Sequence, residues 1–114
     1  KQATVDEVIK ILEVTDTDWA NLQLKIIRQK SPLSIAVTWE QLRRGATLSF
    51  EDCLQLEYRI ALASCQTGEF REGVRALLVD KDNQPKWQHS RIEDVSAADI
   101  LFHFQEPKSG DMSF

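Results

Sequence analysis

Residues that interrupt regular structure are scarce in this sequence, which holds only 4 Gly and 3 Pro among its 114 residues. Hydrophobic residues make up 42% of the chain and charged residues 28%, close to the averages of soluble globular proteins. Such a chain can bury enough apolar surface to offset the entropy of ordering, so disorder is not expected. Its length fits one compact domain with one core and is too short for two.

Two other absences argue against whole classes of function. No apolar run approaches the roughly 20 residues that a membrane-spanning helix needs, so no membrane role is expected. The net charge is −4, and Lys and Arg alternate with Asp and Glu along the chain, so no basic stripe predicts nucleic-acid binding. The densest basic spot, Arg43-Arg44, stands before a glycine, where the dipole of a helix favours cations in its last turn.

Thiol and imidazole groups are also few. Cys53 and Cys65 fall in one predicted helix, several turns apart, so a disulfide between them is excluded and we expect both to be buried and reduced. His89 is expected in a solvated loop and His103 on a partly exposed helix face, without acidic or thiol partners at the spacing of metal ligands. A metal site is therefore not expected.

Caps and the spacing of apolar residues predict about six helices and almost no strand, so the expected fold class is all-α. The predicted segments cover about residues 4–12, 18–29, 32–45, 49–66, 69–79 and 96–106. Thr4, Ser49 and Ser96 each stand three residues before an acidic residue, the spacing of a capping box, and Ser31 precedes a proline at a helix start.

Individual segments carry further expectations. The second predicted helix is apolar round much of its circumference, so it should be well buried. Gly73 costs the fifth helix about 1 kcal/mol relative to Ala, so we expect another group to pack against its bare backbone. The last helix should bury Ile100, Leu101 and Phe104 before Pro107 stops it, and the tail 108–114 should be loose.

Composition and spacing alone identify no catalytic motif. The G-x-S-x-G elbow, the P-loop and the Rossmann glycine pattern are all absent from the sequence. The acidic pairs Glu51-Asp52 and Glu69 with Glu72 stand in the first turns of predicted helices, where acids cap free amides and complement the helix dipole. Residue patterns therefore describe a helical domain without an assigned activity.

One stretch of the sequence is more informative. Residues 70–87 read FREGVRALLVDKDNQPKW, and they resemble the closing motif of the 3-hydroxyisobutyryl-CoA hydrolases, a branch of the crotonase superfamily. Glu-Gly-x-x-Ala alone is typical of crotonase-like C-termini, whereas Asp-Lys-Asp and Pro-x-Trp make the match specific to this branch. The stretches 31–34 (SPLS) and 53–59 (CLQLEYR) and the ending 110–114 (GDMSF) are similar as well. The resemblance covers essentially the whole chain.

The resemblance implies that this chain is the C-terminal helical region of a larger enzyme, spanning residues 1–114. In that family an N-terminal core of stacked β-β-α turns supplies the oxyanion hole and the acidic residues, and the C-terminal helices pack over it. That core is absent from this chain and is its expected partner, so no catalytic residue is expected here. The start at Lys1 rather than Met agrees with a piece of a longer protein.

For the whole protein, the resemblance implies hydrolysis of the 3-hydroxyisobutyryl-CoA thioester during valine breakdown in the mitochondrial matrix. Carboxylates of the core would handle the nucleophile and the protons, and backbone amides would stabilise the developing oxyanion. The implied ligand is an acyl-CoA substrate. No cofactor is expected.

The resemblance also gives two candidate ligand residues. Residues just after the Glu-Gly-x-x-Ala helix approach the coenzyme A nucleotide in crotonase relatives, so Lys81 and Lys86 are candidates to bind its phosphates. The alternative is that both are solvated loop lysines. Hydratases of the superfamily often have an aromatic near Leu77 and a cation near Asp80, and this sequence departs from both. Trp87 is interpreted as an anchor that fixes the loop, in preference to a lid near the substrate.

Two other interpretations differ in class. The chain could belong to a non-catalytic family member that serves as an interaction or ribosome-associated subunit. It could also be an independent helical interaction module, which would satisfy its apolar side chains internally. A C-terminal piece of a larger fold should instead expose an apolar docking surface.

Overall fold

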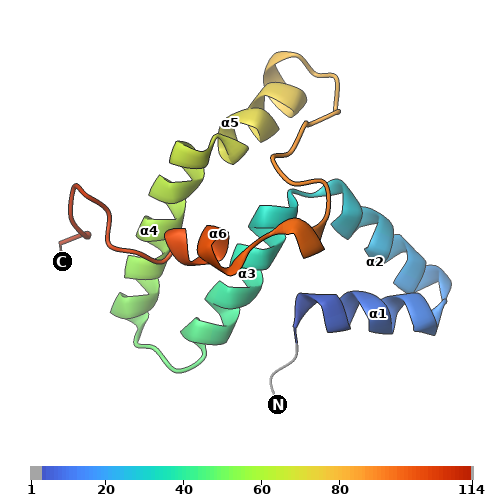
Figure 1. Ribbon diagram of the computed structural model, residues 1–114, viewed down its shortest axis with the longest axis horizontal. Coiled ribbons are helices and arrows are strands. Elements are labelled where there is room, and N and C mark those ends of the chain that lie inside the picture. Colours follow the sequence, from blue (N-terminus) through green and yellow to red (C-terminus); the bar gives the residue numbers. More distant parts are fainter. Residues whose placement is uncertain (1–3, 114) are drawn as a thin grey trace.

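The computed structural model describes residues 4–113, and within them the chain is all-α, as predicted. Six α-helices, one π-helix (η1) and one 3₁₀-helix (η2) follow one another, and residues 4–113 contain no strand (Figure 1). Their bounds are α1 Val5–Thr15, α2 Asp18–Gln29, α3 Pro32–Gly45, α4 Phe50–Thr67, α5 Glu69–Val74, η1 Arg75–Val79, η2 Ile92–Asp94 and α6 Ala97–Phe102. None of the described helices has the length and apolar character needed to cross a bilayer.

The helix starts are fixed locally by side-chain caps. Five α-helices follow a Ser or Thr whose hydroxyl accepts a hydrogen bond from the backbone N–H three residues later: Thr4, Thr17, Ser31, Ser49 and Ser96. At Ser96 the bond is reciprocal, because the Asp99 carboxylate accepts from the Ser96 N–H at 3.0 Å. Each cap satisfies an N–H that the helix leaves without a partner, so the predicted starts are confirmed.

The predicted helix 69–79 forms, but its first part is an α-helix and its second part a π-helix. Gly68, at φ 83°, separates α4 from α5 in the left-handed conformation that glycine adopts without a steric penalty. Past Val74 the winding widens into η1, where the Asp80 N–H donates to the Arg75 carbonyl at 2.8 Å, five residues back. A π turn is rare and is frequently found at functional positions.

The buried apolar core is small and lies where α3, α4 and the end of α6 meet. It contains Leu33, Val37, Leu56 and Phe104, whose exposed fractions range from 2% to 8%. In Figure 1, α6 crosses in front of α3, while α4 lies to one side. We call α3, α4 and α6 together the packed half of the molecule.

The remaining N-terminal helices, α1 and α2, form a hairpin that we call the arm (Figure 1). The expectation that α2 is well buried is wrong, because Ala20 and Leu24 are its only buried residues. Trp19, Leu22 and Ile26 keep exposed fractions of 65%, 53% and 41%. The α1 helix covers α2 along one side, and residues 4–113 offer no cover for the rest of its apolar circumference.

The whole chain is more open than a self-contained domain of its size. Its radius of gyration is 15.5 Å and its accessible surface 8125 Å². A compact protein of this length and mass would have a radius of gyration of roughly 13 Å and an accessible surface of roughly 6,400 Å². Its extents of 46 × 42 × 23 Å describe a flat slab, so many apolar side chains stay on the surface.

The C-terminal segment differs from expectation in three ways. The α6 helix ends at Phe102, five residues before Pro107, and Leu101 is exposed rather than buried, whereas Phe104 is buried as predicted. The tail 108–113 forms no helix, yet the Arg59 guanidinium pairs with both carboxylate oxygens of Asp111, which lowers the pKa of that carboxyl. Part of the tail is therefore held against α4.

Both cysteines are free thiols, as predicted, but they are less buried than expected. Cys53 is half-buried and Cys65 is exposed. The α4 helix presents Cys65 on a side that no described element covers, so periodicity alone overestimated the burial of this thiol.

Candidate functional site

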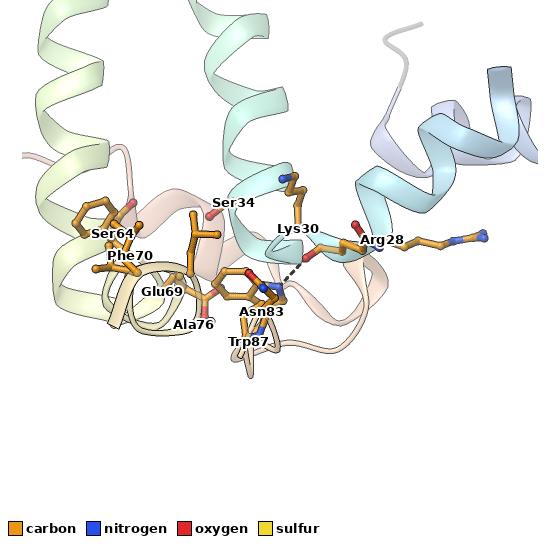
Figure 2. A pocket seen from close by; sticks show the side chains of 15 residues that line it. Arg28, Lys30, Ser34, Ser64, Glu69, Phe70, Ala76, Asn83 and Trp87 are labelled. Carbon is orange, nitrogen blue, oxygen red and sulfur yellow. Dashed lines mark hydrogen bonds between the residues drawn. The ribbon is translucent and has the colours of Figure 1, made fainter. Parts of the chain in front are cut away.

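A groove of about 900 Å³ lies at the junction between the arm, the start of α3, and α5 with η1 (Figure 2). We call it the junction groove. Its walls come from segments far apart in the sequence, joined by the loop that follows η1. The lining residues are Arg28, Gln29, Lys30, Ser34, Ser64, Glu69, Phe70, Gly73, Val74, Ala76, Leu77, Leu78, Asn83, Pro85 and Trp87.

Trp87 ties the loop to both sides of the groove. Its indole Nε1–H donates to the Gln29 carbonyl at 3.2 Å, which satisfies an acceptor at the open end of α2 (Figure 2). Its ring packs on Gly73, where an added Cβ would lie 3.3 Å from Cη2. The expectation that a group packs against the bare backbone of Gly73 is confirmed. These contacts favour the anchor interpretation of Trp87.

Glu69 is a second tie across the groove. The side chain is buried, with a residue exposure of 6%, and it stands at the first position of α5. It accepts one hydrogen bond from the Ser31 hydroxyl and another from the Gln88 N–H at 2.9 Å. One carboxylate thus joins the start of α3, the start of α5 and the loop. The interpretation of Glu69 as a first-turn acid therefore covers only part of its role.

Arg75 gathers three carboxylates around the turn after η1. Its guanidinium donates to both oxygens of Glu72 at 2.9 and 2.7 Å, to Asp80 at 2.7 Å and to Asp82 at 2.9 Å. These bonds raise the pKa of Arg75, and the same guanidinium lowers the pKa of Asp82. Both shifts favour the charged forms of Arg75 and Asp82.

Glu72 extends the Arg75 network to the next part of the loop. Its Oε2 also accepts the backbone N–H of Lys86 at 2.7 Å. The Arg75 fork, followed by this backbone bond, lowers the pKa of Glu72 from its ordinary 4.5 to about 2. Arg75 thus holds the Asp-Lys-Asp stretch through its two aspartates, and Glu72 holds the Pro-x-Trp stretch through the Lys86 N–H.

The two lysines selected from the sequence stand on this loop, outside the groove lining. Lys81 and Lys86 are both exposed, and among the described residues no hydrogen bond or ion pair holds either ammonium. The cations that do line the groove are Arg28 and Lys30, and in Figure 2 the Arg28 side chain extends away from Trp87. Sequence reasoning missed both because they resemble ordinary charges at a helix end.

The two histidines share a partner that the sequence did not reveal. His103 is 2% exposed, so its expected partial exposure is wrong; its Nδ1 lies 2.9 Å from the Asp99 carbonyl oxygen. His89 is half-buried rather than solvated, and its Nε2 lies 3.1 Å from a carboxylate oxygen of Asp99. Within residues 4–113, no group of three or more His, Cys, Asp or Glu side chains is arranged to hold a metal ion.

The groove lining can anchor and cover, but it does not assemble a nucleophile with a base. Its hydroxyls belong to Ser34 and Ser64, and no histidine or cysteine is among its lining residues. Its carboxylate, Glu69, is already bonded to Ser31 and to the loop. The lining is otherwise largely apolar, and Phe70, Leu77 and Leu78 keep exposed fractions of 62–63%.

Known proteins match nearly all of the chain. A family model described as enoyl-CoA hydratase/isomerase matches residues 1–104. The human mitochondrial 3-hydroxyisobutyryl-CoA hydrolase is 38% identical over 111 residues, which are 97% of this chain and 29% of that protein. The small ribosomal subunit protein mS47 of Arabidopsis thaliana is 41% identical over 100 residues, covering 82% of this chain and 24% of that protein. The chain therefore spans less than a third of these relatives.

Two solved structures contain the same helical arrangement. An enoyl-CoA hydratase from Rhodobacter sphaeroides superposes with a TM-score of 0.91 and 34% identity, over 98% of this chain and 34% of that chain. A carnitinyl-CoA dehydratase from Mycobacterium thermoresistibile gives 0.86 and 34%, over 96% of this chain and 32% of that chain. In both structures these helices are about a third of a longer chain.

Proposed function

The chain belongs to the enoyl-CoA hydratase/isomerase family, and from that membership we propose that it is the C-terminal helical part of an acyl-CoA thioester hydrolase. The proposed substrate of the whole protein is 3-hydroxyisobutyryl-CoA, an intermediate of valine breakdown. The 38% identity to the human hydrolase over 97% of this chain supports this choice of relative. In this proposal the helices cover a crotonase core that performs the chemistry.

The observation that carries the proposal is the apolar surface that the chain leaves uncovered. On the arm it includes Trp19 and Leu22, and beside the junction groove it includes Phe70, Leu77 and Leu78, all more than half exposed. Side chains of this size in contiguous patches are typical of interfaces. A core of the size that the relatives imply, more than twice this chain, has ample surface to cover them.

The catalytic steps are assigned to that core, and no catalytic residue is assigned to this chain. Hydrolysis of a thioester needs a nucleophile at the carbonyl carbon, a proton for the leaving thiolate and donors for the developing oxyanion. The junction groove holds no nucleophile paired with a base. The helices instead exclude water from one side of the site and fix the loop that carries the lysines.

Lys81 and Lys86 are proposed to bind phosphates of the coenzyme A nucleotide. Both ammonium groups are exposed, and the neighbouring carboxylates of Asp80 and Asp82 are occupied by Arg75. An ammonium on a flexible stem suits a phosphate as a point charge. Charge reversal at Lys81 in the full-length protein should raise the KM for the CoA ester, and an unchanged KM would assign this lysine to the solvated surface.

The proposed compartment is the mitochondrial matrix. The hydrolase relatives carry the word mitochondrial in their names, and the thioester is proposed to arise from valine breakdown. Import of the full-length protein into isolated mitochondria, followed by protease protection after rupture of the outer membrane, would test the location.

The decisive experiment compares two purified proteins. The full-length protein should hydrolyse 3-hydroxyisobutyryl-CoA with release of free thiol, and the 114-residue chain alone should not. Turnover by the 114-residue chain at a rate near that of the full-length protein would refute the assignment of catalysis to the core.

One alternative is supported by a particular relative. The 41% identity to mS47 is compatible with a non-catalytic member in which the same helices serve a ribosome-associated subunit. In that case the full-length protein would bind ribosomal particles in a sedimentation gradient and would release no thiol. The third interpretation, an independent helical module, has less support because so many large apolar side chains stay exposed.

A further inference from the structure

The loop that carries Lys81 and Lys86 adopts a backbone that needs support. Lys81 and Asn83 have φ values of 56° and 54°, in the left-handed region that residues other than glycine rarely occupy. The Asn83 N–H donates to the Ala76 carbonyl at 2.9 Å, and the Gln84 N–H donates to the Asp82 carboxylate at 2.9 Å. Lys81 itself makes none of these bonds, so its position depends on its neighbours.

Arg75 supplies that support on both sides of Lys81. One nitrogen, Nη1, donates to Asp80 and to Asp82, the residues immediately before and after the lysine. Its Nε and Nη2 donate to Glu72, whose Oε2 in turn accepts the N–H of Lys86, and Nη2 also donates to the Gln84 carbonyl at 3.4 Å. A planar guanidinium with five donors can make these bonds at once, whereas an ammonium lacks the fork geometry.

The same bonds also control the charge next to the lysines. Asp80 and Asp82 flank Lys81 and could otherwise pair with its ammonium, which would compete with an anionic ligand. Arg75 occupies both carboxylates at 2.7 and 2.9 Å, so the positive charge of Lys81 is left exposed to solvent.

We infer that Arg75 is a positioning residue for Lys81 and Lys86: its fork fixes the backbone around the first lysine and, through Glu72, the N–H of the second. It also keeps the adjacent carboxylates from neutralising the first. The inference rests on the proposed contact between these lysines and the phosphates of coenzyme A, and it assigns Arg75 no contact with the ligand.

The test uses the full-length protein and two substrates that share the acyl group. The CoA thioester carries the nucleotide phosphates, and the matching pantetheine thioester lacks them. Arg75→Gln should raise the KM for the CoA ester by about two- to fivefold, the range of a lost exposed ion contact, and should leave kcat and the KM for the pantetheine ester unchanged. Arg75→Lys should not restore the KM, because an ammonium has only three donors and lacks the planar fork that makes four bonds to the three carboxylates.

Three companion variants make the result decisive. Arg71→Gln, a charge removed from an exposed position of the adjoining α5 helix, should leave both KM values unchanged. Asp82→Asn removes one arm of the network and should give a smaller rise for the CoA ester, which keeps the test valid if Arg75→Gln does not fold. When Arg75→Gln is added to a protein that already carries Lys81→Gln and Lys86→Gln, the KM for the CoA ester should not rise further.

The outcomes distinguish this inference from the proposed contact between the two lysines and the coenzyme A phosphates, on which it rests. If the lysine variants raise the KM for the CoA ester and neither Arg75→Gln nor Asp82→Asn does, the positioning role of Arg75 is refuted and the lysine contact stands. If the lysine variants leave that KM unchanged, the lysine contact fails and the inference fails with it. Equal rises for both esters together with a lower kcat would identify a general structural role and would also overturn the inference.

Discussion

The arm and the packed half both form capped α-helices, but they bury very different shares of their apolar side chains. Both regions begin their helices with hydroxyl caps, as at Thr17 and Ser31. In the packed half the caps lead into helices that enclose Leu33, Val37, Leu56 and Phe104. In the arm, α1 buries no residue at all, and Trp19 is 65% exposed. Local signals form a helix in either region, but burial requires a partner.

The largest expected effect is in the packed half. Phe104→Ala removes a ring that is 4% exposed and lies 4.3 Å from the Arg44 guanidinium, so the free energy of unfolding of the 114-residue chain should fall by about 3–5 kcal/mol. Trp19→Ala, in the arm, removes a larger ring and should cost less than about 1 kcal/mol, because that ring is mostly solvated. Urea unfolding followed by circular dichroism measures the free energy of unfolding of each variant. Equal losses in the two variants would contradict the difference in burial between the two regions.

The next effect lies at the boundary between the two regions. Gly73→Val should lower the free energy of unfolding by about 1–3 kcal/mol, because an added Cβ would already lie 3.3 Å from the Trp87 ring, which the Gln29 carbonyl holds in place. Gly45→Ala is the matched control, since its Cβ would meet the Cys53 sulfur at an ordinary 3.6 Å. It should be neutral or stabilise by up to about 1 kcal/mol. A loss at Gly45 as large as that at Gly73 would contradict the anchoring contact.

A smaller and pH-limited effect should distinguish an ion pair of the packed half from one of the arm. Hydrogen bonds from Arg43 lower the pKa of Glu40 from 4.5 to about 2, with Arg44 adding to the shift. Because the folded-state pKa is the lower one, this stabilisation is complete above about pH 4.5 and is lost as the pH falls toward about 2. Glu40→Gln should flatten that part of the stability curve measured by thermal unfolding. Glu13→Gln, from a half-exposed pair with Arg28 at 3.4 Å, should change the stability at neutral pH by less than about 1 kcal/mol.

The smallest expected effect is again in the arm. Leu22→Gln should change the stability of the 114-residue chain by no more than about 0.5 kcal/mol, because this side chain is 53% exposed. In the full-length protein the same substitution should cost about 1.5–3 kcal/mol, the value of burying a leucine. Differential scanning calorimetry of the 114-residue chain and of the full-length protein, each with and without Leu22→Gln, measures the two costs. The same small cost in both would show that the arm stays uncovered.

Most of the helices could be predicted from the sequence because their signals are local. A hydroxyl three residues before an acid, as at Ser96 and Asp99, sets a helix start through bonds within one turn. The widening of α5 into η1 was not predicted, because it depends on how the loop returns to contact α5. The packing of a group on Gly73 was predicted from its missing side chain, whereas the identity of that group, Trp87, came from the structure.

Burial was predicted less well than helix formation. Periodicity marks an apolar face without showing whether anything covers it, so α2 and Cys65 were expected to be more buried than they are. His103 shows the opposite error, because its burial depends on α6 lying across α3. In the candidate site, Lys81 and Lys86 came from the family resemblance, while the bonds of Arg75 to Asp80 and Asp82 could only come from three-dimensional geometry.

The central claim is that the exposed apolar side chains of this chain are covered by the rest of the protein. Hydroxyl-radical labelling read by mass spectrometry reports the exposure of individual residues in the 114-residue chain and in the full-length protein. We predict that Trp19, Leu22, Phe70 and Leu77 are labelled readily in the chain alone and are several-fold protected in the full-length protein. Equal labelling of these residues in both proteins would contradict the claim.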